Sequence, residues 1–256
     1  MIRGRRSTLA LCRVRAKQPM AHVVRTLLAR LVTLGLRMKL LLLDCGFDSV
    51  RVMRELMTGE LPFIMPAVKR GKKPPAPGGP TGTYALATEK KGRWTSYTLH
   101  SPQEGHVDFD LAVVCHHTRG QRGRYQRETL LYATWGVTHR PLSWMRATYR
   151  GRFGIESSYR QVHPARLRTS SRHPVLRLLF VGVALILRNI WVWLHAEVIA
   201  EPQRGALHLG PEALRFARLL LWLLMEVATH YRLLRKVPVS RDLYDRAHAF
   251  GIIFNY

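Results

Sequence analysis

Residues 39–44 hold four consecutive leucines, in the run Lys-Leu-Leu-Leu-Leu-Asp, and this run restricts the folds open to the chain. Residues 19–37 before it repeat apolar side chains at helical spacing, and residues 49–57 after it predict a second helix. A short apolar run that follows a helix is typical of a central strand covered on both faces. With further strands predicted at residues 7–15 and 61–65, the order strand, helix, strand, helix, strand indicates an α/β sheet with parallel neighbours.

Asp44 closes the apolar run. In α/β sheets, ligands bind beyond the carboxyl ends of the strands, and this carboxylate is predicted to lie at such an end. The alternative is that Asp44 only caps the turn or helix that follows it. The sequence leaves both interpretations open.

The charge of the chain restricts its partners. There are 41 lysines and arginines against 16 aspartates and glutamates, a formal net charge of +25. Such an excess destabilises a compact fold by self-repulsion unless a polyanion lies nearby, and the planar fork of arginine suits phosphate. Nucleic acid is therefore the first candidate partner, and an anionic membrane surface is the second. Three widely spaced cysteines without a CxxC pair favour a reducing cytosol.

The pattern changes after residue 68. Residues 69–82 are rich in lysine, proline and glycine, and they predict a mobile loop whose four positive charges could contact phosphate. Between residues 83 and 137, apolar and polar side chains alternate, which predicts antiparallel strands with one wet face. These strands form an insertion into the α/β unit or an extension of it. A basic turn at residues 119–127 could also touch a nucleic-acid backbone.

A basic stretch with one acid follows at residues 149–163, within a helix predicted to start near Leu142. At about 100° per residue, six of its side chains share an arc of roughly 100°. They are Tyr149, Arg152, Glu156, Tyr159, Arg160 and His163. This stripe is either a solvated face with i,i+4 ion pairs or part of a functional site.

Residues 174–198 are apolar enough to resemble a membrane span. Arg177 and Arg188 argue against one, because each arginine costs about 2.5–3.5 kcal/mol at the centre of a membrane helix. Together with His195 they form one polar stripe on an otherwise apolar helix. The pattern predicts a helix packed into a soluble core, and residues 211–236 predict a final amphipathic helix.

Two carboxylates stand out, Asp44 and Glu156. Held together, they could bind divalent metal through oxygen ligands. Paired metal ions stabilise both the attacking and the leaving oxygen in phosphodiester cleavage. The arginines beside Glu156 would then hold the nucleic-acid backbone.

The spacing Tyr149-x2-Arg152-x3-Glu156 resembles the Y-x2-R-x3-E-x6-K signature of DDE transposases of bacterial and archaeal insertion sequences, in the fourth insertion-sequence family. The run that ends in Asp44 is similar to the strand that carries the second catalytic aspartate of that family. The resemblance covers roughly residues 5–200. It implies an α/β fold with a ribonuclease-H-like mixed sheet core, an antiparallel β insertion and a helical C-terminal part.

Carried over to this chain, the resemblance makes Asp44 and Glu156 catalytic ligands of Mg²⁺ or Mn²⁺. The position of the signature's lysine holds His163, a weaker and pH-dependent cation, so neighbouring arginines are expected to take over its phosphate contact. The DNA-binding residues that the resemblance implies are Tyr149, Arg152, Arg160, His163 and Arg166.

One acid of the family's catalytic set is not found. It should lie on the first core strand, but no aspartate or glutamate precedes Asp44. We therefore expect an N-terminally truncated transposase that cleaves DNA poorly or not at all. The alternatives are a non-enzymatic DNA-binding remnant and a basic membrane-associated protein.

The expected domain organisation also follows the resemblance. Residues 1–68 and 140–200 would form the catalytic core, residues 69–139 the basic loop and β insertion, and residues 201–256 a C-terminal helical region. The expected partners are transposon ends and target DNA, with a second copy of the chain in the active form and no membrane. The expected location is the cytoplasm, at the nucleoid.

Overall fold

The computed structural model describes residues 7–75, 77–119, 125–167, 169–199, 201–203, 206–208 and 215–231. The strands of its main sheet are β1 (Leu41–Leu42), β2 (Phe63–Pro66), β3 (Arg93–Ser101), β4 (Gly105–Arg119) and β5 (Tyr125–Trp135). They lie in the order β1-β2-β5-β4-β3. β1 and β2 are parallel, and the other neighbours are antiparallel. The predicted α/β class with a mixed sheet is confirmed.

β1 lies at the edge of the sheet, so its predicted central position is wrong. Among the described residues it pairs only with β2, through Leu41 opposite Phe63 and Leu42 opposite Ile64. The prediction that both of its faces are covered is confirmed, because Leu41 packs on one core cluster and Leu42 on the other. Burial of both faces, rather than of both edges, therefore accounts for the apolar run.

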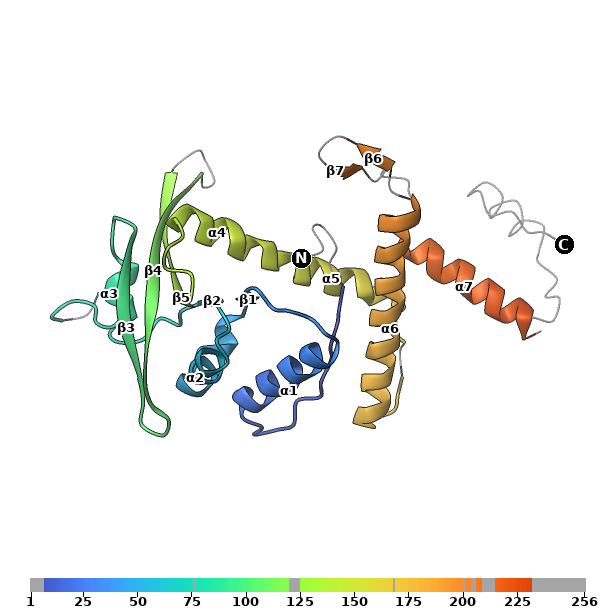
Figure 1. Cartoon of the computed structure of the whole chain (residues 1–256), viewed down its shortest axis with the longest axis horizontal. Helices are drawn as coiled ribbons and strands as arrows, with labels where there is room; N and C mark the ends of the chain where they lie inside the picture. Colours follow the sequence, from blue (N-terminus) through green and yellow to red (C-terminus); the bar gives the residue numbers. More distant parts are fainter. Residues whose placement is uncertain are drawn as a thin grey trace.

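Helices cover both faces of the sheet (Figure 1). α1 (Met20–Thr33) and α2 (Val50–Thr58) lie on one face, and α4 (Leu142–Arg150) lies on the other. Both early helices were predicted, although α1 ends four residues sooner. The Ser49 hydroxyl caps α2 by accepting a hydrogen bond from the Val52 amide at 3.3 Å.

The strands of residues 93–135 belong to the same sheet, because β5 pairs with β2. β4 carries the predicted alternation: its inward side chains are Val107, Phe109, Leu111 and Val113, all buried against α1 and α2. The expected wet face is only partly wet. Asp108 is exposed, but Ala112 and Val114 on that face are buried beneath α4.

The loop at residues 69–82 is fastened at its base rather than free. Arg70 Nη1 donates to Asp48 Oδ2 at 2.8 Å, and the Arg70 amide donates to the hydroxyl of Thr83, at the start of α3 (Thr83–Ala87), at 2.6 Å. Gly71 has a φ of +101°, and a Cβ there would lie 2.3 Å from the Thr81 carbonyl oxygen, so only glycine fits. One of the four predicted phosphate-contacting cations is therefore bound to an internal carboxylate.

Residues 7–15 form no strand, and that prediction is wrong. The segment is extended, but its partner is a side chain. The Thr8 amide donates to Asn189 Oδ1 at 2.9 Å, and Asn189 Nδ2 donates back to the Thr8 carbonyl at 2.6 Å. The Asn189 side-chain amide thus pairs with both the backbone N–H and the backbone carbonyl of Thr8, as the backbone of a neighbouring strand would.

The helix predicted from Leu142 onward is a segmented rod (Figure 1). α4 passes through a 3-10 turn (Gly151–Phe153) into α5 (Gly154–Val162), and a second 3-10 turn (His163–Ala165) follows. A 3-10 turn advances about 120° per residue instead of about 100°, so three such residues rotate the following helix by roughly 60°. The predicted stripe is divided accordingly: Tyr149 is buried, whereas Glu156 is exposed.

α6 (Pro174–Leu194) is followed directly by a π turn, and together they form a helix of residues 174–198. This helix is long and apolar enough to span a membrane, and it is the one such candidate in the described residues. Only 17% of its most apolar stretch is buried. One side of α6 packs into a core cluster, as predicted, but its wide apolar face is mostly exposed. Its buried residues are Ala184, Leu185 and Arg188. Of the predicted polar stripe, Arg188 and His195 face inward and Arg177 is exposed, whereas large apolar side chains on the opposite side face outward.

The remaining described elements follow α6. They are a π turn (His195–Ile199), the short hairpin of β6 (Glu201–Gln203) and β7 (Ala206–His208), and α7 (Phe216–His230). α7 lies within the helix predicted at residues 211–236, whose two ends fall outside the described residues. The basic turn predicted at residues 119–127 lies mostly outside them too.

Candidate nucleic-acid interface

Asp44 lies just beyond the carboxyl end of β1, as predicted. Its Oδ1 accepts a hydrogen bond from the Cys45 amide at 2.8 Å and so caps the 3-10 turn Cys45–Phe47. The capping role raised as an alternative is therefore observed. Half of the side chain (51%) remains exposed, so the cap leaves the carboxylate accessible to a ligand.

Tyr149 and Arg152, more than 100 residues later, lie beside Asp44. The Tyr149 hydroxyl at the end of α4 donates to the Leu43 carbonyl at 3.1 Å. Arg152 Nη2 is 3.4 Å from Asp44 Oδ1, and its guanidinium lies over the Tyr149 ring at 5.5 Å from the centroid. The aspartate strand and the Tyr-x2-Arg segment thus meet at the edge of the sheet where α/β proteins bind ligands.

Burial raises the pKa of the Tyr149 phenol, and the nearby Arg152 guanidinium opposes that rise. The phenol therefore stays protonated at neutral pH and keeps its donor for the Leu43 carbonyl. Arg152 is mostly buried, with 17% of its side chain exposed, so it is preorganised beside Asp44. An ordered guanidinium of this kind can receive a phosphate oxygen with little loss of side-chain entropy.

Glu156 does not join this cluster. It is exposed and lies four residues beyond Arg152, about 6 Å further along the rod. Within the described part of the chain, no ion pair links it to Arg152 or Arg160, so the ion pairs considered for the stripe are not formed. The described residues also contain no group of three or more His, Cys, Asp and Glu side chains that could hold a metal ion. In this geometry Asp44 is engaged by a guanidinium, and Glu156 lies outside that contact.

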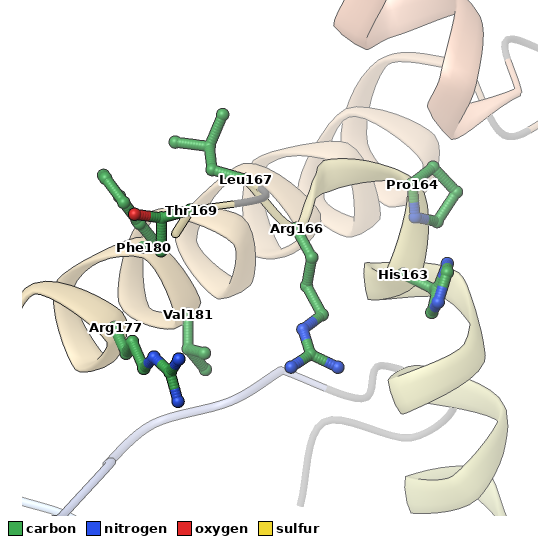
Figure 2. Close-up of a pocket in the computed structure, with 8 residues that line it drawn as sticks. All are labelled: His163, Pro164, Arg166, Leu167, Thr169, Arg177, Phe180 and Val181. Carbon is green, nitrogen blue, oxygen red and sulfur yellow. The ribbon is translucent and has the colours of Figure 1, made fainter. Parts of the chain in front are cut away.

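His163 and Arg166 line a pocket of about 570 Å³ between the end of α5 and the start of α6. Arg177 of α6 lines it too, and Figure 2 shows the guanidinium groups of Arg166 and Arg177 pointing to the same side. Arg177 is held by a hydrogen bond of 2.9 Å from its Nε to the Ser171 carbonyl. The pocket offers three basic side chains to an anion, and the sequence analysis had not assigned Arg177 to that role.

Arg160, the last of the predicted DNA contacts, is exposed on α5 between these two places. The rod therefore presents the cations of Arg152, Arg160 and Arg166 in turn along its length. Their Cα atoms span about 20 Å at helical rise, close to six phosphate steps along one DNA strand.

A second basic pocket, of about 650 Å³, opens where β2 ends. It is lined by Lys69, one of the four cations predicted to contact phosphate. Arg146, Arg150 and the ring of Tyr132 also line it, and the sequence analysis singled out none of these three. Arg146 Nε is buried and has no hydrogen-bond partner among the described residues. The i,i+4 pair of Arg146 and Arg150, which flanks Tyr149, was the available signal.

No protein-family model matches this chain, and a search of curated proteins likewise finds no match.

Proposed function

We propose that this chain is a DNA-binding protein of DDE-transposase ancestry, with a ribonuclease-H-like core, acting at the nucleoid of the cytoplasm. The single observation that carries the proposal is the meeting of the Asp44 turn with Tyr149 and Arg152. These residues are far apart in sequence, yet they match two motifs of one family and contact each other. The net charge of +25 and the cations along the rod supply the electrostatic attraction to phosphate.

The proposed mode of binding is contact with the DNA backbone. Arg152, Arg160 and Arg166 would each neutralise one phosphate along the rod, and His163 would add a further contact. Backbone contacts position DNA but do not read its sequence. Binding of this chain is therefore expected to be strongly salt-dependent and weakly selective.

Binding is expected without efficient cleavage. In the parent reaction Mg²⁺ or Mn²⁺ would stabilise the attacking and leaving oxygens. Asp44 is held by Arg152 here, and the described residues give it no cluster of further ligands, so the side chains present do not fit that metal centre.

The binding test is fluorescence anisotropy with a labelled DNA duplex over a series of salt concentrations. Arg160→Gln and Arg166→Gln should each reduce the slope of log affinity against log salt by about 0.9, the loss of one phosphate contact. Arg25→Gln is the matched control, because it removes the same charge from α1, where Arg25 is paired with Glu55. Equal effects of all three variants would contradict the proposed surface.

Strand cleavage is the second candidate function, and the observation that favours it is the half-exposed Asp44 carboxylate just beyond the carboxyl end of β1. It is tested by incubating the purified chain with supercoiled and linear DNA in Mg²⁺ or Mn²⁺. We expect binding with little or no nicking. Robust metal-dependent cleavage that Glu156→Gln abolishes would establish the enzyme and refute the non-cleaving proposal.

A further inference from the structure

α6 buries polar side chains and exposes apolar ones, the reverse of an ordinary surface helix. Arg188 is 3% exposed, and its Nε and Nη2 donate to Gln161 Oε1 of α5 at 3.3 and 3.2 Å. His195, on the same side, is also buried against Trp191. The opposite side of the helix carries large apolar side chains that are between 38% and 59% exposed. A soluble protein rarely leaves such a surface without a partner.

The exposed side has the spacing of a coiled coil. We define the α6 seam as Leu179, Val183, Ile186, Ile190 and Trp193. The intervals are four, three, four and three residues, so β-branched residues occupy a positions and Leu, Ile and Trp occupy d positions. The five side chains lie within an arc of roughly 80°, opposite the buried face. A seam this narrow is the contact surface of one neighbouring helix.

A lipid bilayer does not suit this helix. α5 packs on the middle of α6, where Val162 joins Ala184 and Leu185 in one buried cluster. If α6 spanned a bilayer, α5 would enter the hydrocarbon with its exposed Glu156 and Arg160. Each such charge costs about 2.5–3.5 kcal/mol at the centre of a membrane, which opposes insertion.

A second copy of the chain suits the seam in charge and in area. The residues that flank the seam are uncharged: Phe180, Gly182, Leu187, Asn189 and Leu194. Two chains of +25 can therefore meet along this face without opposing like charges across it. The seam exposes on the order of 500 Å² per copy, so a pair would bury about 1,000 Å², the lower bound for a specific interface.

We infer that the α6 seam is a homodimer interface in which two α6 helices pack against each other. The inference does not depend on DNA binding. Leu179 and Trp193 lie seven residues on either side of Ile186, so Ile186 is the centre of the seam. If the two seams pair in register about a two-fold axis, Ile186 of one copy lies against Ile186 of the other, whether the two α6 helices run parallel or antiparallel.

The central position of Ile186 defines the test. The full chain, freed of nucleic acid by nuclease and high salt, is examined by sedimentation equilibrium. The wild type should be a dimer, and Ile186→Glu and Ile186→Lys should each raise the dissociation constant by about 100-fold or more through like-charge contact. An equimolar mixture of the two variants should restore the dimer, because opposite charges then meet. Circular dichroism confirms that each variant is folded.

The matched control is Val32→Glu on α1, which changes an apolar residue that is 63% exposed and lies away from the seam. It should remain a dimer. A monomeric wild type, a dimer that survives Ile186→Glu, or a mixture that stays monomeric would each overturn the inference. Flotation of the wild type with phosphatidylglycerol–phosphatidylcholine vesicles, abolished by Ile186→Glu, would overturn it in favour of a membrane.

Discussion

Tyr149 is the residue that joins the two halves of the candidate site. Its hydroxyl donates to the carbonyl of Leu43, one residue before Asp44, and its ring lies beneath Arg152. The same ring packs on Tyr132, at 5.2 Å between centroids. This side chain thus fixes the rod against the end of β1 and holds the guanidinium beside the carboxylate.

Tyr149→Phe should therefore lower the free energy of unfolding by about 1 kcal/mol, since the variant keeps the ring but loses one hydrogen bond to a backbone carbonyl. Urea unfolding followed by circular dichroism measures the change. Tyr159→Phe is the control, because its hydroxyl lies on a side chain that is 66% exposed, and the substitution should have an effect within 0.5 kcal/mol. Equal losses in both variants would show that the Leu43 contact adds nothing.

Tyr132 gives a pH-dependent prediction. Burial raises the pKa of its phenol to about 12, with Tyr149 adding to the rise and Arg146 opposing it. The folded state thus holds this proton more tightly than the unfolded chain, in which the pKa is about 10. The contribution is fully present below pH 10 and is lost as the pH rises towards 12, so the free energy of unfolding should fall in that window.

Urea unfolding at several values between about pH 9 and pH 12 measures this slope. Tyr132→Phe should flatten it relative to the wild type, whereas Tyr159→Phe should leave it unchanged. If Tyr132→Phe keeps the full slope, the loss of stability at high pH comes from other groups.

At the residue scale, the sequence predicted the place of Asp44 but not the geometry around it. Asp44 directly follows an apolar run, and neighbouring residues alone were enough to assign its carboxylate to the end of a strand. The contact with Arg152 depends on the length and phase of a rod more than 100 residues later. The 3-10 turn at residues 151–153 changes that phase. Gly151 and Gly154 bracket it, but two glycines do not by themselves specify a 3-10 turn.

At the scale of elements, the loop of residues 69–82 is fixed by a buried ion pair. The Asp48 side chain is 1% exposed and accepts hydrogen bonds from Arg70 Nη1 at 2.8 Å and the Val68 amide at 2.6 Å. Arg70 Nη2 also donates to the Asp48 carbonyl at 2.9 Å. The pair joins the start of α2 to the end of β2.

Arg70→Met should destabilise the fold by about 3 kcal/mol, because it removes one partner and leaves a buried carboxylate unpaired. Urea unfolding provides the measurement. Lys72→Met, an exposed change in the same loop, should stay within 0.5 kcal/mol. A loss of less than 0.5 kcal/mol in Arg70→Met would show that the pair is incidental.

Helix periodicity located α1, α2 and α6, and alternation located β3, β4 and β5. Both patterns depend on residues that are close in sequence, so strong examples of them predict an element whatever it packs against. The partner of an element is not a local property. Residues 7–15 read as a strand, but they pair with the Asn189 side chain, and α6 showed its polar stripe without showing which side faces inward. A helical wheel gives the separation of two faces and not their orientation.

At the scale of the whole molecule, charge dominates. A net charge of +25 on 256 residues opposes compaction, and the repulsion is screened by salt over about 10 Å at 0.1 M. The melting temperature should therefore rise as the ionic strength is increased from about 0.01 M to about 0.3 M. Differential scanning calorimetry tests this directly.

Lys72→Glu sharpens that test, because it lowers the net charge by two at an exposed position. The variant should melt at a higher temperature than the wild type in low salt, and the difference should shrink in high salt as screening takes over. A wild type that melts at a lower temperature as salt is added, or a variant that gains nothing in low salt, would contradict self-repulsion as the cause.

The paired hydrogen bonds between Thr8 and Asn189 have a consequence for biosynthesis. These residues are 181 positions apart. At roughly 5–20 residues per second, a ribosome needs on the order of 10–40 s to reach Asn189 after it has made Thr8. For that time Thr8 lacks these two hydrogen bonds, while α1, α2 and the sheet can already assemble. Completion of the fold around Thr8 must therefore await translation of α6.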